Sequence, residues 1–462
     1  MAMSLRLPKT RHTKTHNPAG AGWVEACNRR NHALLISQEG THEGAPLAKA
    51  GCCIHRPPDM GAFFGFFLGA STRRSAPYQR VTKAANAQCV NARPLGQPTT
   101  CSTRKNRTLS HKDQSGVGRV SLAGDFLNRL AAKVREQMKA SKVGFLLGAG
   151  SSYLNGMGYP LAFNLWDCIK DRVPADQRAE IQAKLDAENI GIEKALDLLD
   201  LGKHEEGPHR HSVVRAIGEY FSELSPDLTV HRRFVQALSY SAERKVHVFS
   251  LNYDPLIERS AEIECIRLVD GFTGHDRAFF DQSVFTHDLA IIQSGYRGAQ
   301  RRAIPTWLQL VKLHGSMGWY DDPEFGLRRG PFDAPVNAPA QRLMIPPQHR
   351  KAADTVTAPY SRLWSEFRAS LIHGPDHINR LVCIGYGMAD EHVNAVIEAA
   401  LTRTNFTLVI ATKALSDQAF ERWSKHKNAL VVTEDRSSHY GTTGEGHQTL
   451  STFEGIVEEL MK

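Results

Sequence analysis

Four short motifs contain residue types that could bind a phosphorylated ligand and act on it. Each lies at the carboxyl end of an apolar run, and they are 148–152 (GAGSS), 250–254 (SLNYD), 312–316 (KLHGS) and 385–390 (GYGMAD). Glycines let a backbone approach a phosphate closely, and a helix that begins after them offers free amides and the positive end of its dipole. An Asn and an Asp can orient a sugar hydroxyl or a water molecule, and a His can act as a general base near neutral pH.

Each motif is also open to a purely structural interpretation. GAGSS fits any tight turn from a strand to a helix, and it lacks both the Gly-Lys-Ser/Thr of a P-loop and the full G-x-G-x-x-G pattern. Asp254 could cap a helix that starts at Pro255, and Asp390 could cap the next predicted helix. His314 is one of 21 histidines, so it is its place at a strand end that favours a catalytic role.

The apolar runs before the motifs predict the elements that position them. Six runs are short enough to be strands buried on both faces: 142–147, 246–251, 308–313, 380–384, 407–410 and 429–433. Helical patterns cover 126–140, 390–401, 416–425 and 452–461, and between the first two strands, at about 176–242, the signal is helical only. This alternation predicts an α/β fold, a doubly wound (Rossmann-like), mostly parallel sheet with a helical insertion. Open sheets of this kind bind ligands at the carboxyl ends of their strands, where the four motifs would meet.

The first 120 residues differ in composition from the rest of the chain. They hold 18 Lys and Arg against five Asp and Glu, a net charge of +13, whereas residues 121–462 hold 39 against 43, a net charge of −4. The net charge of +9 for the whole chain therefore says nothing about the partner of the second part. Because the first segment lacks sustained periodicity and is rich in polar and turn-forming residues, we expect it to be a mostly disordered basic segment before a catalytic domain at 121–462. Residues added by an upstream start codon are the favoured explanation, and a nucleic-acid-binding arm is the alternative.

Cysteine usage and hydropathy argue against two classes of protein. Eight cysteines without regular spacing are too sparse for a secreted disulfide framework, and the five in segment 1–120 lack the C-x-x-C spacing of a zinc site. The most apolar stretch, 61–70, is shorter than the roughly 20 residues that a membrane-spanning helix needs. We therefore expect a soluble, cytoplasmic protein.

In this order and spacing, the four motifs resemble those of the sirtuin-like NAD-binding domain, over about 145–401. The similarity is to the divergent bacterial branch found in antiphage defence and in partner-dependent NADases. GAGSS looks like the phosphate loop of that family, Gly158-Tyr159-Pro160 like its Gly-x-Pro element, and the other motifs like its Asn-Tyr-Asp, Lys-Leu-His-Gly and Gly-Tyr signatures. The chain departs from the deacetylases, because Cys168, Cys265 and Cys383 are too far apart for their zinc module and residues 159–162 contain no Arg.

The resemblance implies a hydrolase that cleaves the bond between nicotinamide and ribose in NAD+. Asn252, His314 and Asp254 would be the catalytic residues, with the role of Asp254 the least defined. The residues expected to contact the cofactor, which is also the substrate, are Gly148, Ala149, Gly150, Ser151, Ser152, Gly385, Tyr386 and Gly387. No metal is expected, because a cationic pyridinium leaves without a Lewis acid.

The resemblance also implies regulation, because an unregulated NADase would kill its host. A homo-oligomer or a regulatory protein partner is expected to supply the switch. Nucleic acid is expected to act at most indirectly, and no membrane partner is expected. Two other functions stay open, a non-catalytic sensor of NAD or ADP-ribose and, with less support, a protein deacylase.

The composition of segment 1–120 generates the first testable prediction. Removing it should leave the melting temperature and the affinity for NAD+ unchanged, because the segment buries too little apolar surface to contribute to a core. Thermal denaturation and calorimetric titration of residues 121–462 beside the full chain measure both quantities. A shortened chain that precipitates or loses its cooperative transition would contradict this prediction.

Overall fold

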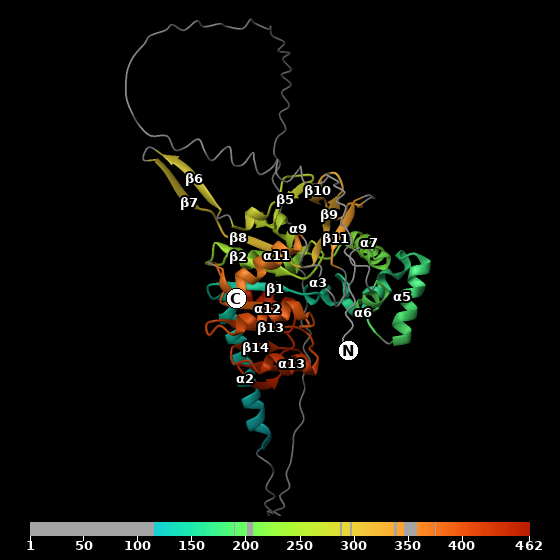
Figure 1. Cartoon of the computed structure of the whole chain (residues 1–462). Coiled ribbons are helices and arrows are strands. Elements are labelled where there is room, and N and C mark those ends of the chain that lie inside the picture. Colours follow the sequence, from blue (N-terminus) through green and yellow to red (C-terminus); the bar gives the residue numbers. More distant parts are fainter. Residues whose placement is uncertain are drawn as a thin grey trace, which may run out of the picture. The chain divides into compact units, whose positions relative to one another are not determined.

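The central feature of the protein is a nine-stranded, mostly parallel sheet, in which β1 lies between β2 and β12. Figure 1 shows β8, β2, β1, β13 and β14 following one another across this sheet. The computed structural model describes residues 115–188, 190–200, 207–286, 289–295, 298–336, 340–345, 358–374 and 376–462. The strand order is β16-β15-β14-β13-β12-β1-β2-β8-β3, and pairing is parallel from β14 through β3. The predicted fold class, a doubly wound and mostly parallel sheet, is confirmed.

The strands of this sheet are β1 (Val143–Leu147), β2 (Lys245–Ser250), β3 (Leu268–Val269), β8 (Trp307–Lys312), β12 (Arg380–Ile384), β13 (Thr407–Ala411), β14 (Ala429–Val432), β15 (Arg436–His439) and β16 (Thr442–Glu445). All six predicted strands are among them, each within one residue of its predicted bounds.

Helices cover both faces of the sheet because successive strand residues point to opposite sides. Leu146 lies in a cluster with α11 (Tyr360–Arg368), α12 (Glu391–Leu401) and α13 (Asp417–Ser424). Its neighbours Phe145 and Leu147 lie in the opposite cluster, with α2 (Ser115–Lys139), α8 (Thr229–Ser239), α9 (Leu256–Ile263) and α14 (Phe453–Met461). This double coverage explains why the strands read as continuous apolar runs rather than alternating ones.

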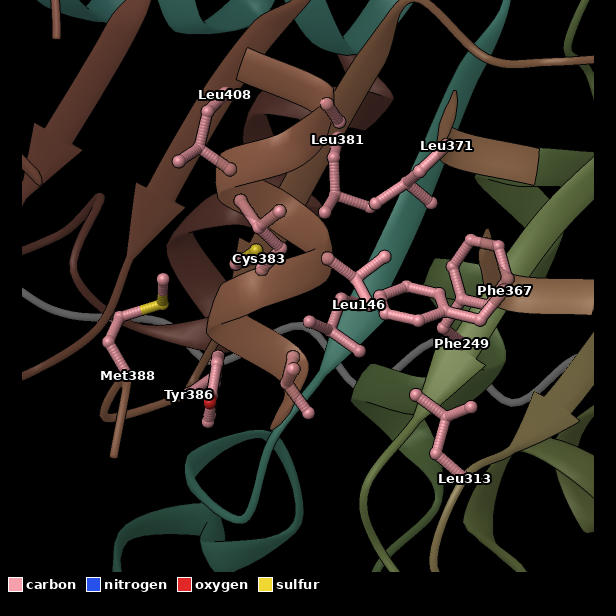
Figure 2. Close-up of a cluster of buried hydrophobic side chains, with 14 of the residues drawn as sticks. Leu146, Phe249, Leu313, Phe367, Leu371, Leu381, Cys383, Tyr386, Met388 and Leu408 are labelled. Carbon is pink, nitrogen blue, oxygen red and sulfur yellow. The ribbon is translucent and has the colours of Figure 1, made fainter. Parts of the chain in front are cut away.

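Figure 2 shows the first of these clusters, in which side chains from neighbouring strands meet those of the covering helices. Phe249 of β2 packs edge-on against Phe367 of α11, with ring centroids 4.9 Å apart. Tyr386 and Met388, from the loop after β12, extend the cluster to the strand ends. Two residues of the predicted motif 385–390 are therefore part of this hydrophobic core.

The described segments between β1 and β2 contain helices only, as the sequence pattern predicts. They are α3 (Gly150–Tyr153), α4 (Ala162–Ile169), α5 (Ala175–Glu188), α6 (Ile192–Leu199), α7 (Pro208–Glu223) and α8, with short 3₁₀ turns between some of them. Buried residues of α4 to α7 form a third apolar cluster, which includes Trp166 and Ile217.

An antiparallel sheet between β3 and α11 was not predicted. Its order is β11-β9-β10-β5-β4, with β4 (Phe272–Thr273), β5 (Ala278–Phe280), β9 (Gly315–Asp322), β10 (Gly326–Arg329) and β11 (Gln341–Met344). A separate ribbon pairs β6 (Ala290–Gly295) with β7 (Gly298–Ala303). Most of these strands are short or contain Gly and charged residues, so they lack the apolar signal on which the sequence analysis relied.

Helix α2 begins at Ser115, well before the predicted start at residue 126. The rest of the segment for which disorder is expected, residues 1–114, lies outside the described residues. Within the described part of the chain, no helix is long and apolar enough to cross a membrane.

The turns that follow β1 and β12 touch each other through their glycines. A Cβ built on Gly148 would lie 2.6 Å from the Cα of Tyr386, and one on Gly150 would lie 2.8 Å from the Cα of Gly385. Gly385 has a φ of +64°, and its own Cβ would lie 2.4 Å from the Ser151 nitrogen. A glycine is therefore needed at position 385 for two reasons: the positive φ, and the lack of space for a Cβ atom.

This contact predicts that Gly385→Ala destabilises the fold by about 2–4 kcal/mol, from left-handed backbone strain plus a clash with main-chain atoms. Gly387→Ala is the matched control, because nothing lies within 4 Å of a Cβ built there, and it should change the stability by no more than about 0.5 kcal/mol. Urea or thermal denaturation of both variants measures the difference. Equal stabilities would show that the two turns can separate without cost.

Candidate functional site

A cavity of about 780 Å³ opens at the carboxyl ends of the strands. Every residue predicted for the site except Ser151 lines it: Gly148, Ala149, Gly150, Ser152, Asn252, Asp254, His314, Gly385, Tyr386 and Gly387. Its wall also includes residues 412–414 after β13 and residues 451–454 at the start of α14. The structure thus brings together motifs that follow four consecutive strands of the sheet, in the order β12, β1, β2 and β8.

The glycine motif after β1 is held tightly by its own backbone. The Gly148 amide donates to the Ile384 carbonyl (2.9 Å), and the Gly150 amide donates to the Gly385 carbonyl (2.8 Å). The Ser151 and Ser152 amides donate to carbonyls within the motif, at 3.0 and 3.1 Å, and the helix that follows, α3, is a single turn. The sequence predicted that the main-chain amides of residues 148–152 are free to bind a phosphate. This prediction is wrong for four of the five residues, whose amides donate to main-chain carbonyls.

Asn252, which follows the neighbouring strand β2, is hydrogen-bonded to this motif. Its Nδ2 donates to the Gly148 carbonyl (3.0 Å) and lies within hydrogen-bond distance of the hydroxyls of Ser152 (2.9 Å) and Ser151 (3.2 Å). The side chain also lines the cavity. Its amide group is thus engaged by the motif, which leaves the carboxamide oxygen as the group suited to a ligand or a water molecule.

Asp254 is buried, and its carboxylate supports the start of α9. Its Oδ1 accepts the amide of Leu256, the first residue of α9, at 3.1 Å, but the N-cap of this helix is Pro255, one residue later than the sequence suggested. The residue also lines the cavity. Asp254 therefore has a local structural role just before the cap, where it holds the turn that carries Asn252.

His314 forms a buried pair with Asp390. The Nε2 atom lies 3.2 Å from Oδ2 of the carboxylate, and the two side chains are only 5% and 6% exposed. The other carboxylate oxygen accepts the amide of His392 at 3.1 Å, so Asp390 is also the N-cap of α12. The Tyr386 hydroxyl accepts the Asp390 amide at 3.0 Å and fixes the start of the helix. A carboxylate held in this way can orient an imidazole ring and stabilise its charged form.

Asp390 lies on the cavity wall beside His314 but is not among the site residues predicted from the sequence. Its helix-capping position was recognised, but the two residues lie 76 positions apart in the chain and no periodicity links them. The one signal available was chemical, because a histidine acting as a base is commonly oriented by a carboxylate.

Two tyrosines on the cavity wall stay in their neutral form. Burial, together with the charge of Asp390, raises the pKa of Tyr386 well above its ordinary value. Burial likewise raises the pKa of Tyr253, whose hydroxyl donates to the Ile345 carbonyl. Both phenols are therefore hydrogen-bonding groups in this site rather than acids or bases.

The described residues offer no cluster that could serve as a metal centre. No group of three or more His, Cys, Asp or Glu side chains among them is arranged to hold an ion. Cys168, Cys265 and Cys383 are all free thiols, and burial raises the pKa of Cys383.

Comparison with known proteins was made at the level of sequence and of structure. A search of curated protein sequences finds no match. Among solved structures, a Sir2 homolog in complex with NAD is 10% identical with a TM-score of 0.37, covering 72% of this chain and 93% of that one. A mutant Sir2 homologue in complex with ADP-ribose is 11% identical with a TM-score of 0.35, covering 71% and 96%.

A family model for the SIR2-like domain matches residues 246–432. The matched range begins in β2 and includes Asn252, His314 and Asp390, whereas the glycine motif after β1 lies before it. The stretch of this chain that supplies the His314–Asp390 pair and Asn252 is thus similar to the SIR2-like domain.

Proposed function

We propose that the protein is an NAD+ hydrolase that cleaves the bond between nicotinamide and ribose. The observation that carries the proposal is the His314–Asp390 pair, which shares a cavity wall with Asn252 and the two glycine turns. The SIR2-like domain match over residues 246–432 supports the choice of NAD+ as the substrate. The cavity volume is within the range of roughly 300–1,000 Å³ that is typical of ligand sites.

The order of the strands suggests how the dinucleotide lies. From β8 to β13 the sheet takes four steps, through β2, β1 and β12, and at about 4.8 Å per step this spans roughly 19 Å. The nicotinamide ribose would lie near Asn252 and His314, at one end, and the adenosine near residues 412–414, at the other. The pyrophosphate would then cross the glycine turns, where the Ser152 hydroxyl lines the cavity.

In the proposed reaction the bond from ribose C1′ to the pyridinium nitrogen breaks and its electron pair leaves with neutral nicotinamide. A water oxygen bonds to C1′ of the oxocarbenium-like centre, and its proton passes to the His314 ring, which yields ADP-ribose. The Asp390 carboxylate would stabilise the resulting imidazolium. Asn252 would orient the water or a ribose hydroxyl through its carboxamide oxygen, and Asp254 would act by holding the turn that carries Asn252.

The biological role that we propose is depletion of NAD+ in bacterial antiphage defence. Control by self-assembly or by a protein partner belongs to the same proposal, because constant turnover would exhaust the host's NAD+. The alternative function, a non-catalytic sensor, predicts that NAD+ is bound without release of nicotinamide.

The proposed roles predict that His314→Ala and Asn252→Ala each lower kcat for NAD+ cleavage by about 10²-fold or more. Asp390→Asn should lower kcat by at least about tenfold, because an Asn still caps α12 but leaves the ring without a carboxylate. Nicotinamide release, followed by chromatography, is the measurement. His211→Ala is the control, because that histidine is exposed on α7, and it should leave kcat unchanged. Turnover at the wild-type rate by any of the three variants, with an unchanged melting temperature, would remove that residue from the mechanism.

A metal-free mechanism predicts that exhaustive EDTA treatment and desalting leave hydrolysis unchanged, because a pyridinium departs as a neutral molecule. The assay compares treated and untreated protein under the same activating conditions, with any partner protein treated separately. Activity that is lost to EDTA and restored by zinc, magnesium or manganese would contradict this part of the proposal.

A further inference from the structure

We propose that Lys312 is a positioning residue, which holds the turn carrying Asn252 against the turn carrying His314 and so sets the turnover rate of the site. This inference rests on the proposed function for its kinetic readout. Lys312 is the last residue of β8, two positions before His314, and its side chain is 2% exposed. It does not line the large cavity, so any effect on catalysis is exerted through its neighbours.

The Lys312 ammonium group contacts the end of the SLNYD motif, which follows the neighbouring strand β2. Its Nζ donates to the Asp254 carbonyl at 2.6 Å and lies 3.2 Å from the Tyr253 carbonyl. On the other side it donates to the Ser316 hydroxyl at 3.0 Å, just after His314. One ammonium group therefore connects the two segments that present Asn252 and His314.

These contacts matter for position because the chain from residue 251 to 254 is neither strand nor helix. Few other hydrogen bonds connect the carbonyls of residues 253 and 254 to β9. The Tyr253 carbonyl also accepts the Met317 amide at 3.1 Å and lies 3.3 Å from the Ser316 hydroxyl, but the Asp254 carbonyl is held by Lys312 at the shortest distance of the set. Loss of the ammonium group would leave the Asp254 end of the turn free to shift.

The charge of Lys312 is balanced by Glu258 of α9, with Nζ 2.9 Å from Oε1 and both side chains buried. A buried pair of this kind adds little to stability overall, because its attraction is offset by desolvation, whereas removal of one partner alone is strongly destabilising. Replacing both residues by apolar ones of similar size thus separates the positioning effect from the effect on folding.

The main test compares Lys312→Met with the double variant Lys312→Met/Glu258→Met in the full chain. The single variant should melt well below the wild type, because Glu258 loses its partner. The double variant should recover most of the melting temperature but keep a kcat about 10–100-fold below the wild type, since a misplacement of about 1 Å can cost 10²-fold. Its KM for NAD+ should change by less than about threefold, because the glycine turns are untouched.

A milder variant covers the case in which the double variant does not fold. Ser316→Ala removes one contact of the same bridge, and kcat should fall by about three- to tenfold with little change in melting temperature. Ser370→Ala is the matched control, because this buried serine pairs with His247 (3.4 Å), away from the site, and it should leave kcat unchanged.

A readout independent of turnover separates this inference from the proposed function. The ¹⁵N signals of the His314 ring, identified by their loss in His314→Ala, should shift in the double variant and in Ser316→Ala, while those of His247 stay in place. If the wild-type protein releases no nicotinamide, the proposed hydrolase function is contradicted, but the spectral test of Lys312 can still be made. Positioning by Lys312 is overturned if a folded double variant turns over at the wild-type rate, or if the His314 signals do not move in either variant.

Discussion

The contact between the glycine turns of β1 and β12 is the constraint on which the candidate site depends. Two main-chain hydrogen bonds, from the Gly148 and Gly150 amides, extend the parallel pairing past the ends of these strands, and the space left by absent side chains is what permits them. The two glycine turns of the cavity wall are therefore joined through their main chains. A site built in this way is rigid before any ligand arrives, which lowers the ordering cost of binding.

Each of the two groups assigned to chemistry is attached to one of these turns. Asn252 is hydrogen-bonded to the turn after β1 through its Nδ2, and His314 forms a buried pair with Asp390, which closes the turn after β12. Lys312 then connects the segments that follow β2 and β8, through the Asp254 carbonyl and the Ser316 hydroxyl. The residues that would act on a substrate are therefore placed by backbone contacts and buried charges rather than by long, mobile side chains, as electrostatic preorganisation requires.

The sequence predicts the parts of this arrangement that depend on apolar runs. Strands such as β1 and β12 are buried on both faces, so their signal is strong, and the rule that ligands bind at strand ends brings Asn252, His314 and Gly385 to one place. The antiparallel sheet around β9 carries no such signal, because its strands are short or rich in Gly and charge. Pairings such as His314 with Asp390 depend on tertiary geometry. The pattern GAGSS likewise does not show that the Gly148 and Gly150 amides are bonded to the carbonyls of residues 384 and 385.

The most direct test of the proposed hydrolysis is a product analysis of purified full-length protein with NAD+ in H₂¹⁸O, over a range of protein concentrations so that self-assembly is included. Hydrolysis predicts equimolar nicotinamide and ADP-ribose, with ¹⁸O in the ADP-ribose and no requirement for an acylated peptide. NAD+ that is bound but recovered intact would contradict hydrolysis and favour a sensor, and cleavage that occurs only with an acyl-lysine peptide would contradict it in favour of a deacylase.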